Sequence, residues 1–166
     1  MGERRFGTGM FGGKFMPYHK GHLYCLETAS RLCDRVYQLL MANCVDEERI
    51  LRTLSGDELL ALSPERRYAR MRAAGRRLGN VETIYMDISR CRTPSGGEDW
   101  DAETPLVLRA CGHFDAVFGS EPSYAAYFRR AYPWAAYIQV DPPRAHYPIS
   151  GTRIRADWEE LSSWRI

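Results

Sequence analysis

The residues best equipped for chemistry lie close together near the N-terminus, in the stretch MFGGKFMPYHKGH at positions 10–22. Two glycines follow a short apolar run, which indicates a strand that ends in a tight turn, and the sequence LYCLETASRLC that comes next has helical spacing. The free N–H groups at the start of a helix favour an anion. Side chains that donate hydrogen bonds crowd the same corner, namely Lys14, His19, Lys20 and His22. The combination predicts a site for a polyphosphate.

A second stretch with anion-binding character, ISGTRIR, occupies positions 149–155. Ser150 and Thr152 supply hydroxyls and a helix start, and Gly151 permits a tight turn. Ser150 has the alternative role of a plain helix cap. Arg153 and Arg155 supply positive charge, but residues two apart cannot lie on one helix face. We therefore expect one of the two arginines to reach a phosphate.

These two stretches resemble the signatures of a known superfamily. GKFMPYHKGH resembles the GxFxPxHxGH motif of the nucleotidylyltransferases, relatives of the class I aminoacyl-tRNA synthetases, and ISGTRIR is similar to their ISxTxIR motif. The likeness is strongest to the nicotinamide-nucleotide adenylyltransferase domain of NadR-type proteins, because GSEPSY at 119–124 and VDPPR at 140–144 also look like that subfamily. It extends over nearly the whole chain and is thin at 45–62.

The resemblance implies an enzyme that joins nicotinamide mononucleotide and ATP, with Mg2+, to give NAD and pyrophosphate by in-line attack on the α-phosphate. It implies catalytic roles for Lys14, His19, His22 and Arg155, with Arg155 favoured over Arg153 for the phosphate contact. The residues that it places at ATP are Gly12, Gly13, Phe15, Gly21, Gly119, Ser120, Ser150, Gly151, Thr152 and Arg153. It places Trp100, Asn43 and Arg144 at the second substrate and implies no metal site made of protein ligands alone.

Structural alternatives compete with several of these roles. His22 would in one alternative cap the helix, with His19 packed beneath it. In another, His19, His22 and Cys25 would bind a metal at three-residue spacing, although we expect the turn at Gly21 to separate His19 from the helix. Trp100 would either stack on a pyridinium ring or form a lid over the edge of the core.

Two familiar nucleotide-binding motifs are disfavoured. The spacing GxGxxG occurs at 7–12, but it precedes or overlaps the first strand, whereas the dinucleotide fingerprint follows a strand and opens a helix. A Walker P-loop would need a glycine where Thr8 stands and a serine or threonine where Phe15 stands. Neither a dinucleotide-dependent dehydrogenase nor a P-loop enzyme is expected.

Strands and helices alternate along the chain. After the first strand, strands are expected at 35–42, 81–88, 115–118 and 136–140, and helices at 22–33, 63–78, 104–111 and from 122, with a helix and loop at 45–62 and a loop holding Trp100 at 90–100. This order predicts an α/β fold, a Rossmann-like parallel sheet of about five strands with helices on both faces, in one domain spanning 1–166. Ligands of such folds lie beyond the carboxyl ends of the strands.

Composition sets the remaining expectations. A net charge of +2 and an apolar content of 45% argue against disorder and against general nucleic-acid binding. No stretch has the character of a signal peptide or a membrane span. The five cysteines lack CxxC spacing, which favours a reducing cytoplasm over a disulfide framework or zinc ribbon. The expected partners are ATP and nicotinamide mononucleotide, without nucleic acid or membrane, and a homo-oligomer stays open.

Two other functions stay open at this point. Another member of the superfamily would transfer an adenylyl or cytidylyl group to a different phosphate ester, such as phosphopantetheine or riboflavin phosphate. A domain of a different class would bind NAD or its precursor as a sensor, without turnover. The presence of Lys14, both histidines and Arg155 argues against the sensor.

Overall fold

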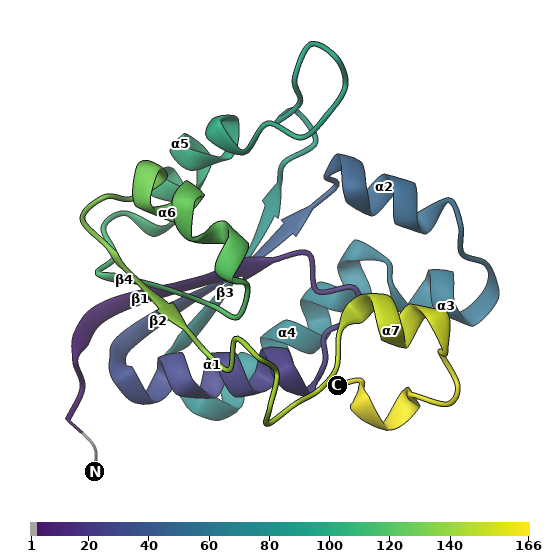
Figure 1. Ribbon diagram of the computed structural model, residues 1–166, viewed down its shortest axis with the longest axis horizontal. Coiled ribbons are helices and arrows are strands. Elements are labelled where there is room, and N and C mark those ends of the chain that lie inside the picture. The colour runs from purple at the N-terminus through teal and green to yellow at the C-terminus, as the bar shows by residue number, and fades with distance from the viewer. Residues whose placement is uncertain (1–2) are drawn as a thin grey trace.

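Five parallel strands form the centre of the computed structural model, which describes residues 3–166 (Figure 1). They lie in the order β3-β2-β1-β4-β5. Their bounds are Phe6–Gly13 for β1, Cys33–Ala42 for β2, Val81–Asp87 for β3, Ala116–Gly119 for β4 and Ala136–Gln139 for β5. The chain winds outward in opposite directions from β1 and β4, so a crevice opens at their carboxyl ends. The expected Rossmann-like α/β fold is confirmed.

Helices cover both faces of this sheet (Figure 1). On one face lie α1 (Lys20–Leu32) and α4 (Pro64–Leu78), and on the other α5 (Trp100–Cys111) and α6 (Ala125–Ala131). The buried side chains between these layers include Phe11, Leu26, Val36, Leu40 and Met71 on the α1 side and Met10, Leu39, Val107, Phe114 and Val117 on the α5 side. Burial of these apolar side chains on each face fixes the sheet between its helices.

A third group of helices lies at one end of the sheet (Figure 1). It comprises α2 (Val45–Leu51), α3 (Gly56–Ala61) and α7 (Gly151–Ala156). Two 3-10 turns are also present: η1 (Pro122–Tyr124) before α6 and η2 (Ser162–Trp164) after α7. A small core of its own contains Met16, Leu62, Ile149, Ile154 and Trp158. None of the helices formed by residues 3–166 has the length and apolar character that crossing a membrane requires.

One predicted boundary is wrong in a way that affects the site. Helix α5 was expected to begin at 104, with Trp100 on the preceding loop, but it begins at Trp100 itself. The reason is Asp99, whose carboxylate caps the helix by accepting a hydrogen bond from the N–H of Ala102 at 3.1 Å. Pro105 therefore lies inside the helix rather than near its start. Other boundaries differ by only a few residues, as at β2, which begins at Cys33.

The GxGxxG spacing at 7–12 lies within β1, as expected from its position. Its middle glycine, Gly9, faces the packed interior, where an added Cβ would lie 2.7 Å from the sulfur of Cys33 and 2.8 Å from the ring of Phe118. This glycine therefore allows close packing of the strand against its neighbours.

A buried ion pair connects the third group of helices to the sheet. Arg67 of α4 and Glu47 of α2 are each only 1% exposed, and their charged groups are 2.6 Å apart. Arg67 also donates hydrogen bonds to the carbonyl of Leu62 at 2.8 Å and to that of Lys14 at 2.5 Å. Glu47 accepts a hydrogen bond from the N–H of Asn43 at 2.9 Å. The pair thus holds the segments that follow β1 and β2.

We predict that Arg67→Met lowers the free energy of unfolding by about 3 to 5 kcal/mol, because it leaves the Glu47 carboxylate buried without a cation. Urea denaturation would measure the loss. The matched control is Arg66→Met on the exposed side of the same helix, which we expect to change stability by less than about 0.5 kcal/mol. Equal effects of the two substitutions would contradict a structural role for the pair.

Candidate active site

The crevice between β1 and β4 opens into a cleft of about 390 Å³. Its walls include Gly12, Gly13, Lys14, Phe15, His19, Gly21 and His22 from the first motif, Gly119 and Ser120 from the end of β4, and Arg144, Ser150, Gly151, Thr152 and Arg155 from the C-terminal segment. The structure therefore gathers all the predicted site residues except Trp100, Asn43 and Arg153 around one cavity, at the topological switch point of the sheet.

The turn after β1 has a strained backbone. Phe15 has a φ of 53°, in the left-handed region, which costs free energy for a residue with a Cβ and persists only where the surroundings fix it. Its ring packs against the rings of Phe11, Tyr18 and His22, with centroids 5.1, 5.3 and 4.8 Å away. A Cβ on Gly13 would lie 3.3 Å from the same ring. These contacts fix the floor of the cleft.

The two histidines of the motif are joined by hydrogen bonds at the start of α1. His19 is the N-cap, and its Nδ1 accepts a hydrogen bond from the N–H of Gly21 at 3.1 Å. The Nδ1 of His22 accepts one from the N–H of His19 at 3.3 Å, which completes a capping box. The rings stack with centroids 3.6 Å apart. The expectation that Gly21 separates His19 from the helix is wrong, because His19 caps the helix directly.

These hydrogen bonds determine which ring atom can act on a ligand. Because both Nδ1 atoms accept, each neutral ring carries its proton on Nε2. Burial lowers the pKa of His19 to about 4, with a contribution from the positive charge of Arg144. Burial also lowers the pKa of His22 well below its ordinary value, with contributions from His19 and Arg144. Near neutral pH both histidines are therefore uncharged donors and not cations.

Lys14 enters the cleft from the turn after β1 and meets an unpredicted partner. Its Nζ lies 2.6 Å from a carboxylate oxygen of Asp46 in α2, which also pairs with Arg49 at 3.0 Å. Burial alone would lower the pKa of Lys14, but the hydrogen bond to Asp46 and the negative charges of Asp46 and Glu98 together raise it. The same bond lowers the pKa of Asp46. Asp46 and Arg49 both line the cleft, and the segment that carries them offered no motif.

Helix α7 contributes a second part of the cleft wall, next to the first motif. Gly151 contacts the first motif so closely that a Cβ would lie 2.7 Å from the carbonyl oxygen of Met16. The guanidinium of Arg155 donates to that same carbonyl and to the hydroxyl of Thr152, the latter at 3.3 Å. Burial lowers the pKa of Arg155. The two sequence motifs are thus in direct contact, and Arg155 lies between them.

The loop that leads to α7 is folded around one carboxylate. Asp141 accepts hydrogen bonds from the N–H groups of Ala145, His146 and Tyr147 at 2.7, 3.0 and 3.2 Å. Arg144 has a φ of 54° and donates to the carbonyl of Ile149 at 2.6 Å. This local network presents Arg144 to the cleft.

Arg153 and Asn43 lie outside the cleft. The guanidinium of Arg153 turns back to the carbonyl of Pro148 at 2.7 Å, because positions 153 and 155 occupy different faces of α7. Its backbone N–H is capped by the hydroxyl of Ser150 at 3.2 Å, so Ser150 is a helix cap that also lines the cleft. The amide of Asn43 donates to the hydroxyl of Tyr85 at 3.3 Å.

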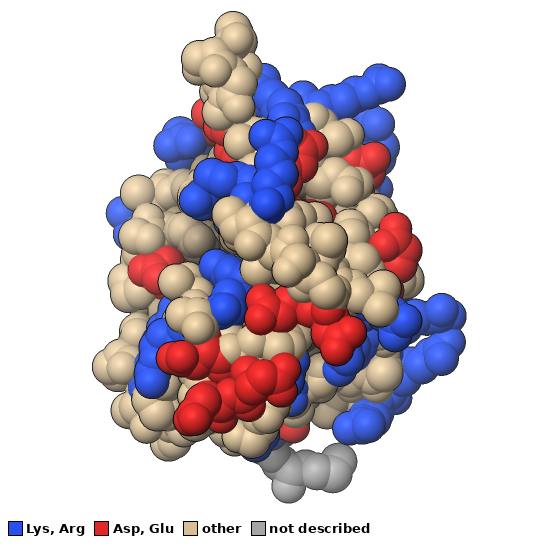
Figure 2. Space-filling model, turned by 90° about the vertical axis from the view of Figure 1, so that its right-hand side faces the viewer, with Lys and Arg blue, Asp and Glu red and all other residues tan. Residues whose placement is uncertain are grey.

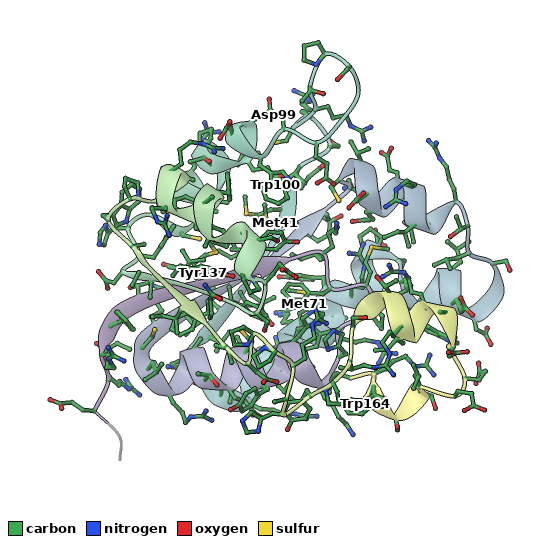
Figure 3. The ribbon with its side chains drawn as sticks, in the orientation of Figure 1. Met41, Met71, Asp99, Trp100, Tyr137 and Trp164 are labelled. Atoms are coloured by element: carbon green, nitrogen blue, oxygen red, sulfur yellow. The ribbon has the colours of Figure 1, made fainter. Side chains whose placement is uncertain are left out.

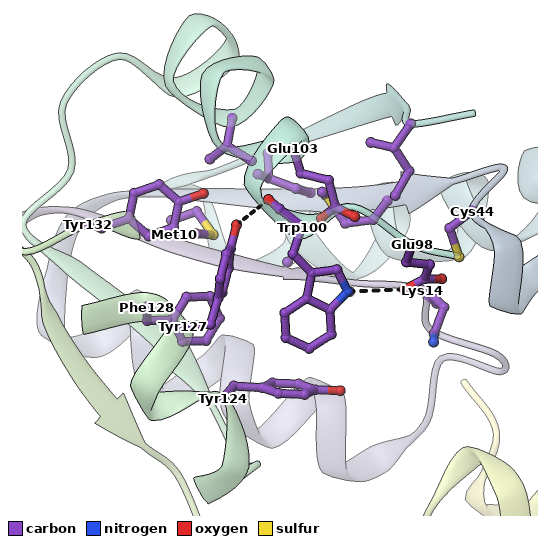
Figure 4. A pocket seen from close by; sticks show the side chains of 16 residues that line it. Met10, Lys14, Cys44, Glu98, Trp100, Glu103, Tyr124, Tyr127, Phe128 and Tyr132 are labelled. Carbon is purple, nitrogen blue, oxygen red and sulfur yellow. Dashed lines mark hydrogen bonds between the residues drawn. The ribbon is translucent and has the colours of Figure 1, made fainter. Parts of the chain in front are cut away.

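Trp100 lines a second, smaller cavity of about 130 Å³, which adjoins the cleft (Figure 4). The two cavities share Gly12, Gly13, Lys14, Tyr124 and Phe128. We call the smaller one the ring pocket. Its walls are mostly apolar and aromatic, and Trp100 packs edge-on against Tyr124 and Tyr127, each at 5.2 Å. Figure 3 shows Trp100 on the side of the sheet that carries Met41, opposite Met71.

The indole of Trp100 is held by a carboxylate. Its Nε1 donates to one oxygen of Glu98 at 3.1 Å, and the other oxygen accepts the N–H of Asp46 at 3.0 Å. The Glu98 carboxylate therefore links the wall of the ring pocket to the start of α2. The sequence indicated Trp100 as a candidate but gave no sign of this partner.

The face that carries α2, α3 and α7 does not favour an anion broadly. It shows acidic and basic side chains intermingled (Figure 2). Among residues 3–166, no group of three or more His, Cys, Asp or Glu side chains is arranged to hold a metal ion.

Comparison with known proteins places this geometry in a structural context. No protein-family model and no curated protein matches the sequence. Solved structures do match the fold. A NadR protein in complex with NAD and AMP-PNP superposes with a TM-score of 0.67 at 19% identity, over 96% of this chain and 44% of that chain.

Two further structures share the fold. One is a bifunctional NMN adenylyltransferase/ADP ribose pyrophosphatase from Francisella tularensis, complexed with AMP and a manganese ion, at a TM-score of 0.60 and 20% identity over 93% of this chain and 42% of that one. The other is described as a candidate nicotinate-nucleotide adenylyltransferase from Vibrio parahaemolyticus. It superposes with a TM-score of 0.53 at 16% identity, over 96% of this chain and 92% of that one. The chain thus spans less than half the length of the NadR and Francisella proteins.

The depressed histidine pKa predicts a pH dependence of stability. Unfolded His19 takes up a proton near pH 6.5, whereas folded His19 does so only near about pH 4. This difference contributes about 3 kcal/mol to the free energy of unfolding above pH 6.5, and the contribution is lost as the pH falls toward 4. In His19→Asn, which keeps a capping side chain, the loss between these pH values should be smaller by that amount. Urea denaturation at several pH values measures it, and the exposed control His146→Asn should keep the wild-type dependence.

Proposed function

We propose that this protein is a nucleotidyltransferase of the nucleotidylyltransferase superfamily, and that it transfers the adenylyl group of ATP to nicotinamide mononucleotide to give NAD and pyrophosphate. The fold is compatible with this reaction, since the Francisella protein described as an NMN adenylyltransferase and a NadR protein that binds NAD and AMP-PNP share it. The residues of the cleft and of the ring pocket supply the further support.

The observation that carries the proposal is the convergence of two sets of donors on one cleft. Lys14, His19 and His22 come from the first motif, and Thr152 and Arg155 come from α7. In adenylyl transfer, negative charge develops on the α-phosphate and on the departing pyrophosphate. Donors that both motifs hold in place beforehand are suited to stabilise this charge, since they need no reorganisation during the reaction.

The reaction requires alignment of the two substrates and does not require a nucleophile from the protein. The attacking oxygen belongs to the phosphate of the mononucleotide, which is largely ionised near neutral pH. The two uncharged histidines donate from Nε2 without taking up a proton, and Lys14 adds a positive charge. On ATP binding, the phosphates would compete with Asp46 for Lys14, so we assign Asp46 the role of holding this side chain in the cleft beforehand.

Magnesium fits this site as a partner of the nucleotide. Mg2+ is commonly held by one or two carboxylates together with substrate phosphates. Asp46 is a carboxylate that lines the cleft, and the residues described supply no complete set of protein ligands. The metal would supply charge neutralisation on the phosphates, while Lys14, Arg155 and the histidines orient them.

The ring pocket supports a pyridine as the base of the second substrate. Its volume is about 130 Å³, close to the cavity of about 150 Å³ that holds one benzene in another protein. A single six-membered ring therefore fits this space. Aromatic faces such as that of Trp100 also attract a cationic ring. Trp100 is therefore our candidate for contact with the pyridinium.

The test is an assay of the purified protein with ATP, Mg2+ and a panel of phosphate esters, following pyrophosphate release and product mass. We expect NAD from nicotinamide mononucleotide. Turnover only with another ester would replace the acceptor that we propose, and tight binding of nicotinamide mononucleotide without turnover with any ester would favour a sensor.

We predict that His22→Ala lowers kcat by at least about a hundredfold, the scale expected for one preorganised transition-state donor. The effect should appear in single-turnover kinetics with saturating ATP. His113→Ala, at an exposed histidine that lines neither cavity, is the matched control and should keep full activity. Thermal unfolding of both variants separates lost catalysis from lost folding, and near-normal turnover by His22→Ala would exclude the proposed role.

A second prediction concerns the ring pocket. Trp100→Ala should raise the KM for nicotinamide mononucleotide about tenfold, on the scale of a cation–π contact, with little change in the KM for ATP. Steady-state kinetics with each substrate varied in turn would show the difference. Trp134→Ala, at an exposed tryptophan whose Nε1 contacts the carbonyl of Phe114, is the control. A parallel rise in both KM values would place Trp100 outside the base contact.

A further inference from the structure

Among the side chains that line the ring pocket, three carry charge: Lys14, Glu98 and Glu103. Two of them are already engaged. Lys14 pairs with Asp46, and both oxygens of Glu98 accept hydrogen bonds, from Trp100 and from the backbone of Asp46. This leaves Glu103 as the charged group of the pocket without a fixed partner among the described residues.

Glu103 is placed to meet a ligand. It follows Trp100 by three positions on α5, so the two side chains lie on one face of the helix, and both line the pocket (Figure 4). The carboxyl is half-buried, and no hydrogen bond joins it to another described residue. A polar group withdrawn from water in this way gains free energy from a partner that a ligand brings.

We propose that Glu103 determines which pyridine base the ring pocket accepts, by hydrogen bonding to a carboxamide on the ring and by excluding a ring that bears a carboxylate. This inference rests on the proposed function. A carboxamide both donates and accepts, so it can pair with Glu103 in either protonation state. A carboxylate only accepts, so it can pair only with protonated Glu103 and is repelled by the ionised form.

The surroundings of Glu103 make this choice depend on pH. Burial raises the pKa of Glu103 to about 7, and the negative charges of Glu98 and Asp99 raise it while Lys14 lowers it. The other titratable groups around it are Cys44 from the N-cap of α2, Cys91 from the loop after β3, Tyr124 from η1, Tyr127 from α6 and Tyr132 directly after α6. Glu103 is therefore ionised above neutral pH and protonated below it.

The experiment compares nicotinamide mononucleotide with nicotinate mononucleotide as acceptors, at about pH 6 and about pH 8.5. The ratio of their kcat/KM values is the readout, because the phosphate that both substrates share titrates alike and cancels. We expect the wild-type ratio to favour the amide and to rise at least about tenfold from the lower to the higher pH, as a group with a pKa near 7 loses its proton.

Glu103→Gln should lower the ratio at high pH and remove its pH dependence, because glutamine keeps a donor at every pH. Asp101→Asn is the matched control, since Asp101 is an exposed carboxylate of the same helix that pairs with Arg130 on the surface, and it should leave the ratio and its pH dependence as in wild type. A wild-type ratio that does not change with pH, or a Glu103→Gln ratio equal to it, would overturn the assignment.

The outcomes separate this inference from the proposed function. Turnover of either mononucleotide with an unchanged ratio overturns the role of Glu103 alone. If neither is turned over, calorimetric dissociation constants for the same two mononucleotides give the same ratio and decide on Glu103 independently. Binding of neither mononucleotide overturns both proposals.

Discussion

The Arg67–Glu47 pair is the contact on which the geometry of the cleft depends. Two charges that are each 1% exposed need one another, and the remaining polar atoms of both need hydrogen-bond partners. Those partners are the carbonyl of Lys14 after β1, the N–H of Asn43 after β2 and the carbonyl of Leu62 before α4. One buried pair therefore sets the distance between the first motif and α2. It places Lys14 and the residues of α2 on the same side of the cleft without itself lining either cavity.

The two histidines of the first motif show a similar dependence, because the hydrogen bonds that cap α1 also determine which ring nitrogens can donate. The capping box at the start of α1 uses the Nδ1 atoms of His19 and His22 and so commits both Nε2 atoms to carry protons. Burial of the rings then keeps them neutral. The observed capping role of these histidines and their proposed role as donors therefore depend on the same contacts.

Much of the fold could be predicted because the information is local. Alternating strands and helices gave the parallel sheet, and Ser63 with Pro64 marked the start of α4. The first and last motifs were expected to share a cleft, and they do. The parts of the site that could not be predicted depend on contacts between residues distant in sequence. Asp46 belongs to a short helix without a motif, and it becomes part of the site only through Lys14. Arg153 matches the motif, but its place on α7 directs it away.

Glu98 explains why the two cavities form one site. One of its oxygens holds the indole of Trp100, and the other holds the backbone of Asp46, whose carboxylate holds Lys14. Two carboxylates, those of Glu98 and Asp46, and three hydrogen bonds thus join the wall of the ring pocket to Lys14 in the cleft. In the proposed reaction the base and the phosphate of one substrate occupy these two places. A rigid connection between them fixes where the attacking oxygen lies relative to the donors of the cleft, and alignment of this kind is the main requirement of in-line transfer.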